Sequence, residues 1–144
     1  MEKLATNNDA ILILKLYELR TEATLREARA WMTNDFWPAN AEEFFAIHRA
    51  FGSRENAYLR QVISYWEMAC TFVLHGCLSP ELFLDCNGEN IFLLAKFDPF
   101  LAQIDEQLPS FMSKTREVVR KYPEATATYE RMLKSVARRR TVPQ

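Results

Sequence analysis

The most apolar part of the chain is the stretch from Val62 to Leu74, VISYWEMACTFVL, in which only Ser64, Glu67 and Thr71 are plainly polar. These three belong to a series of polar residues that steps by four, three, four and four: Arg60, Ser64, Glu67, Thr71 and His75. On a helix, at about 100° per residue, this spacing gathers all five side chains in one narrow stripe. Because the rest of the circumference is apolar or aromatic, other helices should cover it. The pattern therefore predicts a central helix at about 54–75, capped by Ser53 and ended at Gly76.

Helical patterns flank this stretch on both sides. The expected segments begin at a capping residue, at a proline or at the start of an apolar run: Asn8 or Asp9, Asn40, Ser79, Ile91, Ser110 and Pro123. The first should run towards Asn34, and the fourth is interrupted at Asp98-Pro99, where the helix kinks or stops. No segment alternates like a β-strand. The sequence thus predicts an all-α protein, an irregular bundle of about six or seven helices around the central helix, as a single helical domain over residues 1–144.

The composition agrees with a compact helical protein. Only three of the 144 residues are glycine, while 49% are hydrophobic, a balance that disfavours disorder. No apolar run approaches the roughly 20 residues of a membrane span, and the chain does not open on a signal-peptide pattern. The cysteines, Cys70, Cys77 and Cys86, are odd in number and form no CxxC pair, which is typical of reduced thiols. We expect a cytoplasmic protein without a membrane segment.

Several short segments resemble a known group of proteins. They are SYWEMA and HG in and after the central helix, LSPELFLD and NGE in the following segment, then FDPFLAQ, Arg116, Pro123 and Tyr129-Glu130. Over roughly Ile11 to Leu133, the chain resembles a family of small bacterial proteins of unknown function. The resemblance implies a cytoplasmic, all-helical domain without an assigned activity, and it therefore carries over no catalytic residues.

Glu67 is the residue that most needs an explanation, because a carboxylate on a helix built for burial is costly unless it is paired or hydrogen-bonded. One interpretation is that the polar stripe reaches solvent, or that Glu67 forms a buried ion pair with an arginine such as Arg116. The other is that the stripe Arg60, Ser64, Glu67, Thr71 and His75 lines a pocket, with Glu67 as acid, base or anchor and His75 at the rim. The spacing allows both.

Other kinds of site find little support in the sequence. There are two histidines and no Glu-x-x-His or His-Glu-x-x-His motif, so we predict neither a metal nor another cofactor. The poverty in glycine excludes phosphate-binding loops. Cys77, close to His75, is the one thiol with an activating neighbour in the sequence, which is weak support for a nucleophile. His48 is expected to be a partly exposed surface residue.

Charge is uneven along the chain. Residues 53–108 carry three basic and eight acidic side chains, and residues 109–144 carry nine and three. We favour the interpretation that the C-terminal helices pack on the acidic middle, over weak nucleic-acid binding by the basic segment, because no helix–turn–helix signature precedes it.

The expected function is a non-catalytic interaction or regulatory module that associates with itself or with another protein. The reason is a surplus of large aromatic residues for one small core: Trp31, Phe36, Trp37, Phe44 and Phe45. The first alternative is an enzyme or small-ligand binder with a pocket along the Glu67 stripe. The second is the nucleic-acid interaction of the basic C-terminal segment.

Overall fold

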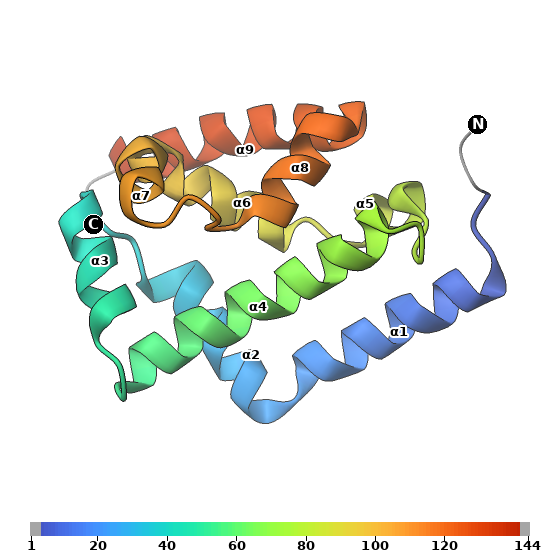
Figure 1. The fold of residues 1–144 in the computed structure, drawn as a ribbon, viewed down its shortest axis with the longest axis horizontal. Helices are drawn as coiled ribbons and strands as arrows, with labels where there is room; N and C mark the ends of the chain where they lie inside the picture. The colour runs from blue at the N-terminus through green and yellow to red at the C-terminus, as the bar shows by residue number, and fades with distance from the viewer. Residues whose placement is uncertain (1–3, 142–144) are drawn as a thin grey trace.

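The computed structural model describes residues 4–141, which are helical nearly throughout (Figure 1). This part of the chain forms nine α-helices and two short turns of other helical types, and contains no strand. In chain order they are α1 (Asn7–Thr21), α2 (Ala23–Ala30), the π-helical turn η1 (Trp31–Asp35), α3 (Ala41–Arg49), α4 (Arg54–Leu74), α5 (Pro80–Cys86), α6 (Glu89–Phe97), the 3₁₀ turn η2 (Asp98–Phe100), α7 (Leu101–Gln107), α8 (Ser113–Lys121) and α9 (Pro123–Thr141). The predicted all-α bundle is confirmed.

The helices are more numerous than six or seven because two expected segments are divided. The first segment breaks at Glu22, whose extended backbone (φ −58°, ψ 142°) ends α1. The Glu22 carboxylate then accepts the backbone N–H of Leu25 at 3.0 Å and so caps α2. The second division falls at Asp98-Pro99, where η2 separates α6 from α7.

The predicted central helix is α4. Ser53 caps it by accepting the N–H of Asn56 at 3.1 Å, and Gly76, with a φ of 78°, turns the chain out of it. In Figure 1, α4 crosses the molecule diagonally between α1 and α2 on one side and α5, α6 and α8 on the other. It contacts α2, α3, α5 and α8.

A second helix, α6, is enclosed even more completely than α4. Seven of its nine residues are buried: Asn90, Ile91, Leu93, Leu94, Ala95, Lys96 and Phe97. Helices α8 and α9 pack against it. The hydrophobic core is therefore built on α4 and α6 together, whereas the sequence pattern singled out α4 alone.

The large aromatic residues that suggested an interface lie in this core. Phe36, Phe44 and Phe45 are buried, and Trp31 and Trp37 are partly buried. The Trp31 and Phe36 rings stack with centroids 4.7 Å apart, and the Phe44 and Phe97 rings meet edge to face at 5.4 Å. The aromatic surplus therefore supplies packing inside the molecule and gives no reason to expect an interface.

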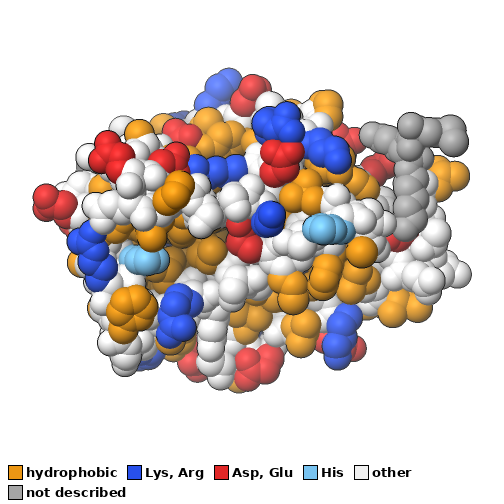
Figure 2. All heavy atoms as spheres, in the orientation of Figure 1, with side chains coloured by type: hydrophobic (Ala, Val, Ile, Leu, Met, Phe, Trp, Pro, Cys, Tyr) orange, Lys and Arg blue, Asp and Glu red, His pale blue; other side chains and the backbone are white. Residues whose placement is uncertain are grey.

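Most residues of helix α1 are exposed to solvent. Only Asp9 and Leu16 are buried in it, and it lies along one side of the molecule against α2 and α5. The Asp9 carboxylate accepts the N–H of Ser79 at 2.9 Å, and the Tyr65 hydroxyl donates to the Leu16 carbonyl. Figure 2 shows hydrophobic side chains at the surface over the region of α1 and α4.

Candidate functional site

Glu67 reaches from α4 to the start of α8. Its Oε1 accepts the N–H of Lys114 at 2.9 Å, and its Oε2 accepts the N–H of Thr115 at 2.9 Å and the Thr115 hydroxyl at 2.8 Å. Free N–H groups at a helix start carry positive partial charge, which a carboxylate stabilises. Glu67 thus caps a helix that is distant in the sequence.

The local sequence of α8 explains why the cap comes from elsewhere. The residue at the capping position is Met112, which has no side-chain oxygen and sits in the left-handed region at φ 52°. The first turn of α8 contains no acidic residue. Glu67 therefore supplies both the acceptor and the negative charge that the α8 sequence lacks.

A buried polar chain continues from Glu67 into the core. Behind Thr115 lies Cys70, with its Sγ 3.6 Å from the Thr115 hydroxyl, and the Asn90 side-chain amide donates to the same sulfur at 3.2 Å. Burial raises the pKa of Cys70 to about 11, so this thiol keeps its proton and can donate it to Thr115. A protonated, buried thiol is a poor nucleophile.

The other members of the polar stripe are satisfied locally. The Thr71 hydroxyl donates to the Glu67 carbonyl at 2.7 Å, the Ser64 hydroxyl to the Gln61 carbonyl at 3.3 Å, and Arg60 Nε to Asn56 Oδ1 at 2.9 Å. Arg60, Ser64 and His75 are exposed, while Glu67 and Thr71 are partly buried. The stripe therefore runs from solvent into the α4–α8 contact and back to solvent.

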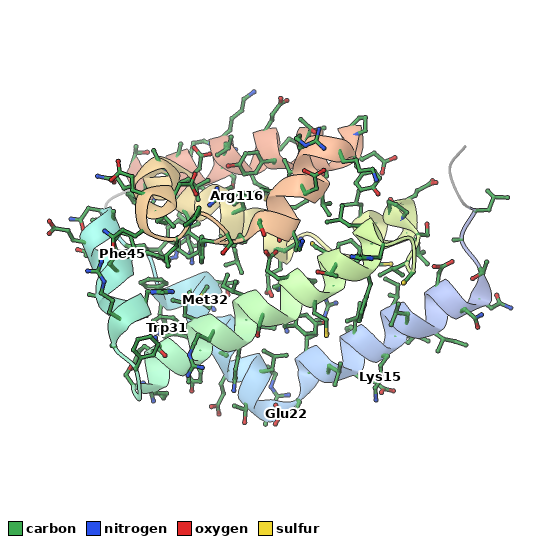
Figure 3. The ribbon with its side chains drawn as sticks, viewed as in Figure 1. Lys15, Glu22, Trp31, Met32, Phe45 and Arg116 are labelled. Atoms are coloured by element: carbon green, nitrogen blue, oxygen red, sulfur yellow. The ribbon has the colours of Figure 1, made fainter. Side chains whose placement is uncertain are left out.

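Arg116 does not form the expected ion pair with Glu67. Its guanidinium donates from NH1 to Asp105 Oδ1 at 2.7 Å. Arg116 (labelled in Figure 3) follows Thr115 on α8, and its side chain reaches Asp105 on α7 while the Glu67 carboxylate is taken up by the N–H groups of Lys114 and Thr115. The Nε and NH2 groups of Arg116 are buried without a hydrogen-bond partner.

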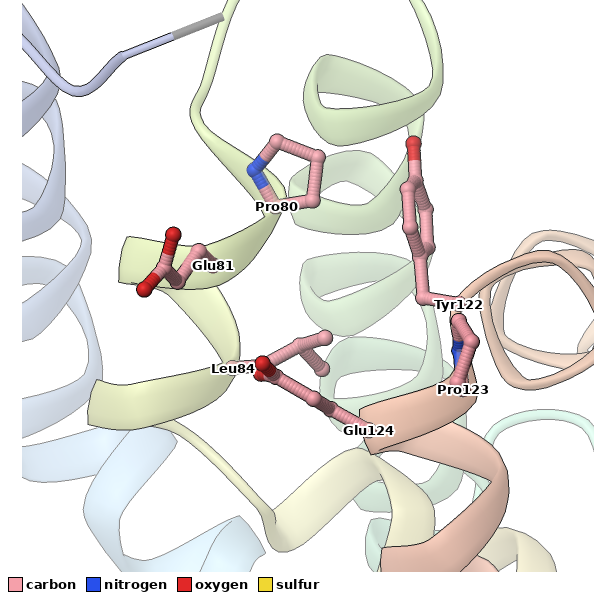
Figure 4. A pocket seen from close by; sticks show the side chains of 6 residues that line it. All are labelled: Pro80, Glu81, Leu84, Tyr122, Pro123 and Glu124. Atoms are coloured by element: carbon pink, nitrogen blue, oxygen red, sulfur yellow. The ribbon is translucent and has the colours of Figure 1, made fainter. Parts of the chain in front are cut away.

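Glu67 lines neither of two surface hollows. A groove of about 470 Å³ runs between the end of α1, α2 and α4, and Ser64 is the one residue of the stripe in its wall. Its other lining residues are Leu19, Glu22, Leu25, Gln61, Tyr65 and Met68. A smaller cleft of about 160 Å³ lies between the start of α5 and the junction of α8 and α9, with Pro80, Leu84 and Tyr122 in its walls (Figure 4).

Sequence reasoning missed a buried lysine. Lys96, in the last turn of α6, has no exposed surface, and its Nζ donates to the Met32 carbonyl in η1. Burial, together with the charges of Arg140 and Arg139, lowers the pKa of Lys96 to about 7. The feature of the sequence that could have indicated its burial is the position of Lys96 inside the apolar run IFLLAKF.

A partly buried ion pair was also missed. Arg29 on α2 makes a two-point contact with the Glu89 carboxylate at 2.9 and 3.1 Å, and the Trp66 indole N–H donates to the same carboxylate at 2.8 Å. Glu89 is the first residue of α6, so its charge also suits the positive end of that helix. The contact joins α2, α4 and α6, which is a structural role.

Two further findings concern metal binding and membrane insertion. Within residues 4–141, no group of three or more His, Cys, Asp or Glu side chains is placed to hold a metal ion. No helix in that range is both long and apolar enough to cross a membrane.

Comparison with protein families gives a match over most of the chain. Residues 5–122 match DUF4760, a domain of unknown function. The chain belongs to this family. The DUF4760 match takes in α1 to α8 and ends directly before α9. Comparison with curated proteins and with solved structures gave no significant match.

Proposed function

We propose that this DUF4760 protein is a non-catalytic interaction module that self-associates through the outward face of α1. Ile11 and Leu14, each 63% exposed, carry the proposal. They are three residues apart and so lie together on the face of α1 that points away from buried Asp9 and Leu16. Leu4, 87% exposed, precedes the helix. Neighbouring exposed aliphatic side chains often mark a protein contact.

The partner that this face suits best is a second copy of the chain. In an antiparallel pair of α1 helices with its two-fold axis between Ile11 and Leu14, each Ile11 faces the Leu14 of the other copy. The same register places each Glu18 over the first turn of the other α1, where the helix end is positive. Glu18 is exposed and is held near Lys15 at 3.7 Å, so it is available at the rim.

The expected dimer is weak. One helix face covers less than the roughly 1,200–2,000 Å² of a stable interface, so association should depend on concentration. A cytoplasmic location belongs to the same proposal, since the cysteines are free and two of them, Cys77 and Cys86, are exposed, which suits a reducing compartment.

Sedimentation over a wide range of protein concentration tests the proposal. We expect the wild-type protein to dimerise as concentration rises, and the Ile11→Glu variant to remain monomeric because the pair would bury two like charges. Phe51→Glu is the matched control, since Phe51 is 75% exposed but lies outside α1. A monomeric wild type, or an Ile11→Glu variant that dimerises as the wild type does, would overturn the proposal.

A second candidate function is a small-ligand site in the groove of about 470 Å³ beside Ser64. Leu19, Leu25 and Met68 give it apolar walls, which suits an apolar ligand. A fluorescent apolar probe that binds the wild type and Ile11→Glu but not Met68→Glu would favour this function. We do not extend the proposal to nucleic acid, because Arg139 and Arg140 of the basic segment lie against Trp37.

A further inference from the structure

Three basic side chains surround the indole of Trp37. The Lys96 Nζ lies 5.1 Å from the ring centroid, the Arg139 Cζ 4.3 Å and the Arg140 Cζ 5.3 Å. None of the three takes part in an ion pair with a described carboxylate. The cluster joins the last turn of α9 to the end of α6 and to the loop after η1.

Arg140 holds α9 in this position. It donates from NH1 to the Pro38 carbonyl at 2.8 Å and from NH2 to the Lys96 carbonyl at 2.9 Å, and it lies 5.2 Å from the centroid of the Phe100 ring. Two carbonyl acceptors and two aromatic rings therefore fix one guanidinium. This contact ties the end of α9 directly to the backbone of Lys96.

The π-helical turn η1 supplies the hydrogen-bond acceptor for the buried lysine amine. In this π-helical turn the N–H of Phe36 bonds to the carbonyl of Trp31, five residues back. The Met32 carbonyl accepts a hydrogen bond from the Lys96 amine, and Figure 3 labels Met32 beside Trp31. The amine also lies 5.8, 5.1 and 5.5 Å from the ring centroids of Phe36, Trp37 and Phe97.

A proton on Lys96 acts against the α9 contact. Arg140 and Arg139 on α9 both disfavour the charged amine, as does burial, and Glu89 at the start of α6 favours it. From η1 and the residues that follow it, the groups that face the amine are uncharged: the rings of Phe36 and Trp37 and the Met32 carbonyl. Burial and the two arginines lower the pKa of Lys96 from 10.5 to about 7. In an open state, in which the amine reaches water, that pKa would return towards its ordinary value.

We infer that the last turn of α9 is a clasp, formed by Arg139 and Arg140, which closes on Trp37 while Lys96 is uncharged and is loosened when Lys96 takes up a proton. Opening would expose Trp37 and the end of α6. This inference is independent of the proposed self-association, because the clasp and α1 share no residues.

Amide hydrogen exchange of the last turn of α9 tests the clasp. After correction for the intrinsic effect of pH, we expect exchange at least tenfold faster near pH 7 than two pH units higher. The difference arises because an open state with a higher Lys96 pKa gains about a decade per pH unit in that range. Below pH 7 the effect should level off, since Lys96 is then charged in both states.

Variants separate the clasp from general flexibility. Lys96→Met should keep the last turn protected and remove the pH response, while Lys134→Met, at an exposed position of α9, should leave the response intact. Arg140→Gln should give fast exchange at both pH values. A wild type whose corrected exchange is the same at both pH values, or a Lys96→Met protein that retains the response, would overturn the inference.

A second measurement covers the case in which Lys96→Met does not fold. The indole N–H resonance of Trp37 should shift with pH in the wild type, and in Arg140→Gln it should stay at the position of the low-pH form. A Trp37 resonance that does not move with pH would also overturn the clasp.

Discussion

At the scale of single residues, Glu67 shows what a helical pattern can and cannot predict. The pattern identified it as a carboxylate on a helix that is otherwise apolar, and such a residue needs a partner. The partner is the start of α8, more than forty residues later in the chain. The sequence offered Arg116 as a plausible cation, but it could not reveal that the capping position of α8 is Met112, which provides no oxygen.

Replacing Glu67 should therefore destabilise the fold. Glu67→Gln keeps the shape but removes the charge and turns one acceptor into a donor that faces backbone N–H groups. We expect the free energy of unfolding to fall by about 1–3 kcal/mol in a urea titration. Ser64→Ala, one turn away on the exposed part of the stripe, should change it by less than about 0.5 kcal/mol. Equal effects of the two substitutions would contradict the capping role.

At the scale of helices, the sequence predicted those starts that use the usual capping residues. Ser53 and Ser79 accept backbone N–H groups at the starts of α4 and α5 as expected. The break at Glu22 was not predicted, because glutamate is a rare cap and no glycine or proline marks the end of α1 there. Phe51 follows Phe44 by seven residues, a spacing that places both on one face of a continuous helix, yet Phe51 is 75% exposed because α3 already ends at Arg49.

The turn between α4 and α5 offers a test of backbone conformation alone. Gly76 has a φ of 78°, and a Cβ placed there would meet no atom within 4 Å. Gly76→Ala should therefore cost about 1–2 kcal/mol of unfolding free energy through its left-handed backbone, without a clash. At Gly88 the backbone conformation is open to other residues and the nearest atom to an added Cβ is Met132 Cε at 3.9 Å, so Gly88→Ala should cost less. Thermal unfolding of both variants tests this expectation. A greater loss of stability for Gly88→Ala than for Gly76→Ala would contradict it.

At the scale of the whole molecule, the basic and the acidic parts of the chain contact each other within the fold. The basic segment packs on the acidic middle through the contacts of α9 with α6 and of α8 with α4, and Arg116 pairs with Asp105 across this boundary. The sequence favours this arrangement. It could not predict that the last arginines of α9 would meet rings and carbonyls in place of carboxylates, because that depends on where the end of α6 lies.

The buried amine of Lys96 should make global stability depend on pH. Its pKa is lowered from 10.5 to about 7, so between these values the unfolded chain binds more protons than the folded one and stability rises with pH. The contribution is smallest below pH 7 and complete above 10.5, but the raised pKa of the Cys70 thiol opposes it above pH 9. Between pH 7 and 9 we expect the urea unfolding free energy to rise by up to about 1.4 kcal/mol per pH unit. Lys96→Met should abolish this slope and Lys134→Met should preserve it, whereas a flat wild-type profile would mean that Lys96 stays charged in the core.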